Sequence, residues 1–203
     1  MIRPNVIHIS LVLALISPAL HAEIEITPFT GSRISGEFTD VASGVTLEVD
    51  DSSTRGFAFE VDYESGVQTQ FLYSRQSSAL RADSNLSSNL LFDIDVEYMH
   101  FGGVVLTPIN KDMKSFAGAG VGVAKFSPAI PEHTSESEFS FNINGGFKLQ
   151  LSKHLGLRAG LILYGTPVNS NSSIFCTNGS CNIHYNSSFY TQFEANIGLL
   201  IKF

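Results

Sequence analysis

The most constraining feature of this chain is an alternation of apolar with polar or small residues that recurs along most of its length. It is clearest in the segments 57–63 (FAFEVDY), 92–98 (FDIDVEY) and 189–203 (FYTQFEANIGLLIKF). A period of two places successive side chains on opposite faces of a β-strand. No window of useful length keeps the 3.6-residue period of a helix, so we expect an all-β protein.

The first 22 residues depart from this pattern and predict a secretory signal peptide. Arg3 supplies a short basic region, residues 6–16 form an apolar run, and small residues lead to a cleavage site after Ala22. An anchor helix is the alternative, but the run is shorter than the roughly 20 apolar residues that span a bilayer. We therefore expect a signal peptide at 1–22 and one mature domain at 23–203.

The mature chain has eight alternating segments, and the connections between them are alternately longer and shorter. We expect strands at about 24–38, 54–63, 67–75, 91–106, 115–126, 139–151, 156–165 and 189–203. The longer connections are expected at 39–53, 76–90, 127–138 and 166–188, and the shorter ones at 64–66, 107–114 and 152–155. In a closed up-and-down sheet this order brings every long loop to one end, as in outer-membrane barrels with short periplasmic turns and long extracellular loops.

Alternation alone does not tell which face lies inside, because a soluble barrel is apolar within and a membrane barrel is apolar outside. Here the polar positions are rich in Gly, Ser, Asn and Gln and poor in Lys, which suits a packed lumen better than a surface in water. A soluble lipocalin-like barrel is the alternative, but the chain has no Trp and so lacks the Gly-x-Trp start of such proteins. The sequence predicts an eight-stranded antiparallel up-and-down transmembrane β-barrel.

Several segments resemble a known family. They are ITPFTGSRISGEF, DIDVEYMHFGGVVL, GAGVGVAKFSP, HLGLRAGLILYGT and the terminal stretch from SIFCTNGSC to FEANIGLLIKF. Together they look like the small outer-membrane β-barrel domain proteins of Gram-negative bacteria, of the OmpA, OmpX and OmpW kinds. The resemblance implies a place in the outer membrane. It also implies that the last strand, ending in Phe203, is the signal read by the barrel-assembly machinery, and most such proteins have no established activity.

Cys176 and Cys181 are the only cysteines, and both fall in the longest connection. The signal peptide sends them to an oxidising compartment, so we predict a disulfide between them. A metal site with His184 is the alternative. It has three ligands without a clear fourth, which is too few for a structural zinc site.

Charged residues on the polar positions are the candidate functional groups of the lumen. On the expected parity they are Glu60, Asp62, Asp93, Asp95, Glu97, Lys148, Arg158 and Glu194, with Lys202 as a further cation. Glu60 and Asp62 lie as close to a short turn as Lys148 and Arg158 do, so these groups can meet at one depth and plug the barrel with ion pairs. The alternative is a narrow or cation-preferring pore, with Asp93, Asp95 and Glu97 along its outer half and small residues at Gly118, Gly120 and Gly122 leaving space.

The remaining features predict a non-enzymatic protein with a structural or surface-interaction role and no cofactor. His133 and Ser135 form a His-x-Ser triplet that would suit a lipid-A-modifying enzyme, but it lies in an acidic loop that is more simply a solvated cap. The acidic loops could also bind cations that bridge to lipopolysaccharide phosphates. A net charge of −7 argues against nucleic acid. We expect a monomer whose partners are outer-membrane lipid, lipopolysaccharide and the assembly machinery.

Overall fold

A computed structural model describes residues 23–35, 37–39, 46–84, 87–129, 135–167, 173–177, 180–184 and 189–203. The predicted signal peptide and His133 lie outside these residues, so cleavage after Ala22 stays a prediction. No helix in the described part of the chain is long and apolar enough to cross a membrane.

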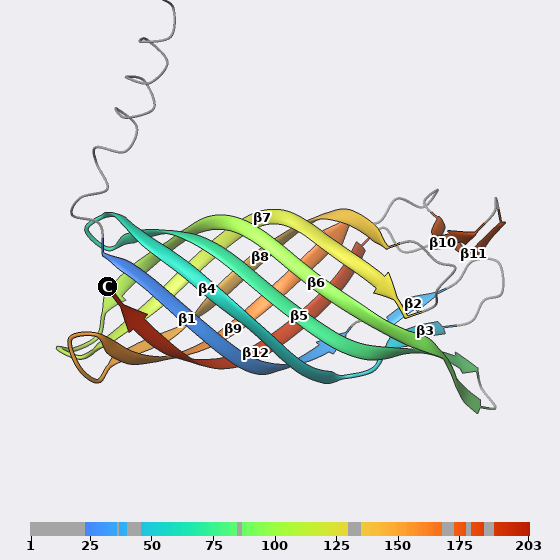
Figure 1. The fold of residues 1–203 in the computed structure, drawn as a ribbon, viewed down its shortest axis with the longest axis horizontal. Coiled ribbons are helices and arrows are strands. Elements are labelled where there is room, and N and C mark those ends of the chain that lie inside the picture. The colour runs from blue at the N-terminus through green and yellow to red at the C-terminus, as the bar shows by residue number, and fades with distance from the viewer. Residues whose placement is uncertain are drawn as a thin grey trace, which may run out of the picture.

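Eight antiparallel strands close into a barrel, as predicted (Figure 1). They are β1 (Ile24–Ser35), β4 (Ser52–Glu64), β5 (Val67–Ser84), β6 (Ser87–Pro108), β7 (Met113–Pro128), β8 (Glu136–Gln150), β9 (Leu155–Pro167) and β12 (Phe189–Lys202). Each strand pairs with the next along the barrel, and β1 closes the sheet by pairing with both β4 and β12. Closure leaves no free sheet edge around the wall.

Short turns join the strands at one end of the barrel, which we call the turn end. They span 65–66, 109–112 and 151–154, and both termini of the barrel lie beside them (Figure 1). Gly66 has a φ of 81°, which allows the two-residue turn between β4 and β5. The longer connections all lie at the opposite end, the loop end, as the sequence predicts.

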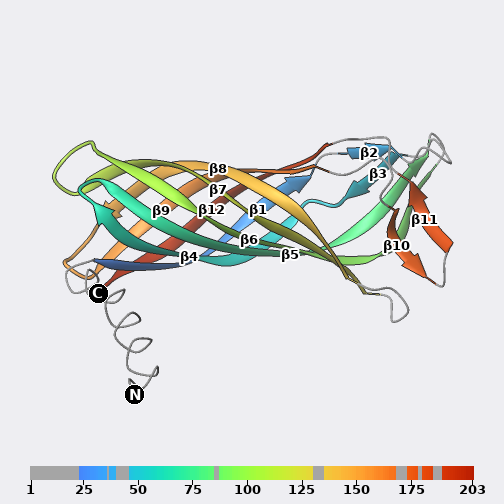
Figure 2. The same ribbon diagram turned by 90° about the horizontal axis from the view of Figure 1, so that it is seen from above.

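The loop end carries additional strands. β2 (Glu37–Thr39) and β3 (Thr46–Val49) form a small hairpin that extends the sheet along β5, whereas β10 (Ser173–Thr177) and β11 (Ser180–His184) make a separate hairpin (Figure 2). The segment 76–90, expected to be a loop, is instead a continuation of β5 and β6, which stay paired as far as Ser84 and Ser87. The sequence of this extension is rich in polar residues and lacks the apolar alternation that marks the lower strands.

The outer wall next to the turn end is an apolar band. Large hydrophobic side chains point outward from every part of the barrel, including Phe101 at 62% exposed, Ile143 at 58% and Ile197 at 56%. Inward positions at the same level are buried and mostly polar. This arrangement is the reverse of a soluble barrel and matches a wall that faces lipid.

The parity predicted for β6 is wrong in its upper part. Ile94, Val96 and Tyr98 are buried inside the barrel, so Asp93, Asp95 and Glu97 face outward instead of lining the lumen. Below Tyr98 the apolar residues change to the odd positions, where Phe101 and Val105 face outward. The reversal has a physical cause, because the upper part of the strand lies above the apolar band, where an aqueous exterior favours polar residues outside and apolar residues within.

Candidate functional site

The lumen near the turn end contains a cluster of buried charges around Lys148 on β8. Its Nζ atom lies 2.6 Å from Glu25 Oε2 and 2.6 Å from Glu60 Oε2, and it donates a hydrogen bond of 2.7 Å to Gln68 Oε1. β1, β4 and β5 supply these three partners, so one ammonium group ties together strands from the opposite wall. The predicted meeting of Glu60 with Lys148 is present. Glu25 was missed, although its place between Ile24 and Ile26 marks it as an inward residue.

Arg158 on β9 lies beside Lys148 and completes this cluster. The two residues are Cα partners, and the Arg158 guanidinium stacks on the ring of Phe116 at 4.2 Å from its centroid. Its Nη2 atom is 4.0 Å from Glu60 Oε1. Two neighbouring cations are thus balanced by the carboxylates of Glu25 and Glu60. Asp62, the remaining predicted member, lies at the rim and accepts a hydrogen bond of 2.8 Å from Gln68 Nε2.

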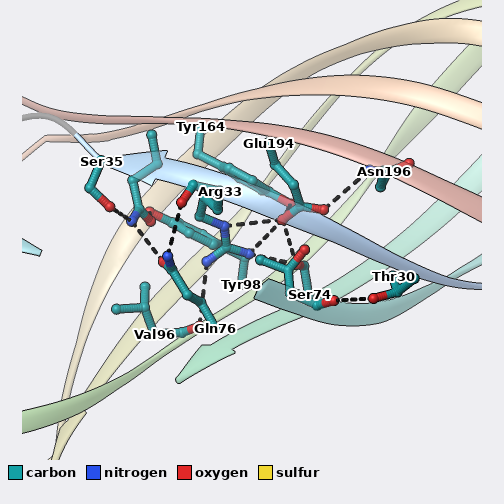
Figure 3. Close-up of polar contacts among 12 residues, drawn as sticks. Thr30, Arg33, Ser35, Ser74, Gln76, Val96, Tyr98, Tyr164, Glu194 and Asn196 are labelled. Atoms are coloured by element: carbon teal, nitrogen blue, oxygen red, sulfur yellow. Dashed lines mark hydrogen bonds and ion pairs between the residues drawn. The ribbon is translucent and has the colours of Figure 1, made fainter. Parts of the chain in front are cut away.

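A second buried cluster lies nearer the loop end, around Arg33 and Glu194 (Figure 3). Arg33 on β1 and Glu194 on β12 are Cα partners, and the Nε and Nη2 atoms of the guanidinium lie 3.0 and 2.8 Å from Glu194 Oε2. Ser74 Oγ donates a hydrogen bond of 2.7 Å to the same oxygen. The predicted inward position of Glu194 is confirmed by its complete burial, whereas Arg33 was missed.

Two tyrosines enclose this second cluster. The rings of Tyr98 and Tyr164 stack with centroids 4.0 Å apart, and the Arg33 guanidinium lies 4.9 Å from each centroid. Tyr98 also donates a hydrogen bond of 2.8 Å to Gln192 Oε1. Both rings are fully buried and come from nearly opposite strands, so they fill the middle of the lumen.

The charges of the two clusters are balanced. Three buried carboxylates, from Glu25, Glu60 and Glu194, face three buried cations, from Arg33, Lys148 and Arg158. A charge removed from water is tolerated only when a partner compensates for it. Each of these buried charges has an oppositely charged group within 4.0 Å, although the three guanidinium nitrogens of Arg158 make no hydrogen bond within the described residues.

The glycines of β7 do not border open space at Gly118 and Gly120. A Cβ atom added at Gly118 would lie 2.9 Å from Val104 Cγ2, and one added at Gly120 would lie 2.9 Å from Asn142 Nδ2. Side chains of the neighbouring strands β6 and β8 occupy the space that these glycines provide. The expectation that Gly118, Gly120 and Gly122 leave an open wall is therefore not met at the first two positions.

Other predicted site residues lie apart from the lumen. Asp95 and Glu97 pair on the outer wall with Arg75 at 2.7 Å and Lys125 at 3.9 Å. Cys176 and Cys181 are Cα partners in the β10–β11 hairpin, a register that suits a disulfide, but their side chains lie outside the described set and the bridge stays a prediction. Phe203 is exposed at the turn end, and its role in assembly also stays a prediction.

Solved structures of other proteins share this barrel architecture. No protein-family profile and no curated protein matches the sequence. Among solved structures, the outer membrane protein OprG from Pseudomonas aeruginosa superimposes with a TM-score of 0.62 at 12% identity, over 90% of this chain and 96% of that chain. This chain has the fold of a small outer-membrane β-barrel.

Two further structures agree. Neisserial surface protein A (NspA) gives a TM-score of 0.58 at 10% identity, over 90% of this chain and 99% of that chain. The outer membrane protein AlkL gives 0.51 at 14% identity, over 90% of each chain. At these identities the likeness concerns the fold alone, and it confirms the predicted barrel class. Together with the apolar band it supports the predicted outer-membrane location. Because outer-membrane barrels have short periplasmic turns and long extracellular loops, we expect the turn end in the periplasm and the loop end outside.

Proposed function

We propose that this outer-membrane barrel is closed to solutes and acts as a non-enzymatic structural or surface-interaction protein through its extracellular end. The observation that carries the proposal is the Lys148 Nζ atom, bound by Glu25, Glu60 and Gln68 within 2.7 Å across the lumen. An eight-stranded barrel has an interior just wide enough for side chains. Here two charge clusters and a tyrosine stack occupy that interior.

The periplasmic mouth supports the same conclusion. It opens into a vestibule of about 220 Å³ whose lining includes Glu25, Lys148 and Lys202. Lys202 binds Glu25 at 3.0 Å, so the vestibule ends on the ion pairs of the first cluster. An entering ion would have to break these contacts, each made in a region where uncompensated charge is costly.

Single-channel recording of the refolded mature protein in planar bilayers tests this proposal. We expect the wild type to be silent, and Lys148→Ala combined with Arg33→Ala to conduct, because one cation has left each cluster. The matched control is Arg55→Ala, on the outer wall of β4, with Lys153→Ala in a periplasmic turn, which removes two exposed cations that do not line the lumen or its vestibule. Steady cation-selective conductance by the wild type would refute the closed lumen and favour the narrow pore.

A further inference from the structure

The outer wall has a sharp border at the extracellular edge of its apolar band. One outward-facing row consists of apolar and aromatic residues that are successive cross-strand partners: Phe57, Tyr73, Met99, Val123 and Phe139. The next row toward the loop end, which we call the boundary row, consists of Arg55, Arg75, Glu97 and Lys125. On β4 and β5, the step from Phe57 and Tyr73 to Arg55 and Arg75 is the change from apolar to charged side chains that is expected where lipid tails give way to headgroups.

The boundary row contains two arginines side by side. Arg55 and Arg75 are direct Cα partners on β4 and β5, and like charges in such a position repel each other. Arg75 Nη2 lies 2.7 Å from Asp95 Oδ2, whereas Arg55 makes no ion pair in the ranges that the structure covers. The row therefore presents a cation without a counterion next to a second cation that is half exposed.

The acidic groups nearby are already engaged by other partners. Glu97 accepts a hydrogen bond of 2.6 Å from Tyr73 Oη and lies 3.9 Å from Lys125 Nζ. Asp95 accepts a hydrogen bond of 2.6 Å from Ser77 Oγ in addition to its contact with Arg75. These contacts hold the two carboxylates on the β6 side and leave the β4 side of the arginine pair positive.

A hollow of about 390 Å³ lies at this arginine pair. Its lining residues are Ser53, Arg55, Arg75 and Ser77. Two guanidinium groups and the Ser53 hydroxyl offer several N–H and O–H donors, the set that suits a phosphate with its three or more acceptor oxygens, while the Ser77 hydroxyl donates to Asp95. Directly below the hollow lie Phe57 and Tyr73, whose rings are 5.7 Å apart and offer an apolar surface to an acyl chain.

From this geometry we propose that the Arg55–Arg75 hollow binds a glucosamine phosphate of lipopolysaccharide in the outer leaflet. The ligand has to be anionic to satisfy the arginine pair, has to lie at headgroup height, and has to carry acyl chains that cover the aromatic row beneath. A phosphorylated lipid A meets all three conditions at the extracellular border. The proposal concerns the outer wall and does not depend on whether the lumen conducts.

The test measures binding of purified lipid A to the refolded mature protein in zwitterionic micelles. We expect lipid A that carries its phosphates to bind about tenfold or more tightly than dephosphorylated lipid A, since charge-assisted contacts to two arginines are lost with the phosphate. Arg55→Gln with Arg75→Gln should reduce the affinity for phosphorylated lipid A to the dephosphorylated level. The matched control, Lys111→Gln with Lys153→Gln, removes the same charge at the periplasmic end and should bind as the wild type does.

The ligand comparison is made on the wild type, so it decides the question even if the double variant does not refold. Equal binding of the two lipid A forms would overturn the proposal. Phosphatidylglycerol that binds as tightly as lipid A, or inorganic phosphate that displaces lipid A completely, would overturn the assignment to lipopolysaccharide. Unchanged affinity in the refolded Arg55→Gln, Arg75→Gln variant would show that the phosphate binds elsewhere.

Discussion

The Arg33–Glu194 pair allows a direct test of how the lumen is stabilised. Arg33→Met removes the guanidinium but keeps a long apolar side chain beside the stacked rings of Tyr98 and Tyr164. Glu194 then stays buried, with the hydrogen bonds from Ser74 at 2.7 Å and Asn196 at 3.1 Å but without its ion pair. Both members of the pair have side chains that are 0% exposed, so water in the barrel does not replace the lost partner.

The expected cost follows from this geometry. Breaking a buried ion pair by removing one partner destabilises a protein by about 3–5 kcal/mol. Glu194 retains three hydrogen bonds, from Ser74, Asn196 and, at 3.4 Å, Tyr164, so we expect the free energy of unfolding to fall by about 3 kcal/mol, the lower end of that range. Adding Glu194→Gln removes the uncompensated charge. The double variant should therefore be more stable than Arg33→Met alone.

Urea unfolding of the refolded protein in lipid vesicles measures these differences. The chain has no Trp, so far-UV circular dichroism and the gel mobility of unheated samples are better probes than intrinsic indole fluorescence. Arg55→Met is the matched control, because it makes the same change at an exposed position and should alter stability by less than about 0.5 kcal/mol. Strictly additive costs of Arg33→Met and Glu194→Gln would refute the reasoning, because coupled residues depart from additivity.

Two further predictions concern the barrel wall and the extracellular hairpin. Gly122→Ala should lower stability more than Gly120→Ala in the same unfolding assay. The added Cβ at position 122 would overlap the backbone oxygen of Met99, whereas at position 120 it would lie 2.9 Å from the movable side-chain amide of Asn142. Equal losses of stability would contradict this. Without reductant, the refolded protein should leave Cys176 and Cys181 unlabelled by maleimide, and Cys176→Ser should expose one reactive thiol and reduce stability by roughly 2 kcal/mol or less. Labelling of the unreduced wild type would exclude the disulfide.

The sequence predicts the barrel well because closure, strand number and loop placement all follow from period-two alternation. Inside the apolar band, polar residues of this alternation face the lumen and apolar residues face outward. The inward positions of Glu60, Lys148, Arg158 and Glu194 were therefore predicted correctly. The same rule, applied to Glu25 in the first strand, would have found a direct partner of Lys148.

The errors lie where the environment outside the wall changes. A strand keeps its parity along its length, but the apolar positions of β6 change from even to odd after Tyr98. In the sequence this change appears only as two consecutive apolar residues, Tyr98 and Met99, and a β-bulge would produce the same pattern. Asp95 and Glu97 were therefore assigned to the lumen. The continuous β5–β6 pairing was missed for the same reason, since a sheet in water on its outer side needs no lipid-facing residues.

The reversal of parity in β6 also bears on how far the β5–β6 pair extends from the membrane. Above the boundary row the wall has an interior of Ile94, Val96 and Phe126 and a polar exterior, so it holds together without lipid. From Arg75 to Ser84 the paired strands rise roughly 20–25 Å farther, given the usual rise per residue and tilt (Figure 1). The continuous pairing thus carries the end of β5 and the start of β6 beyond the boundary row, where both strands are available to partners outside the membrane.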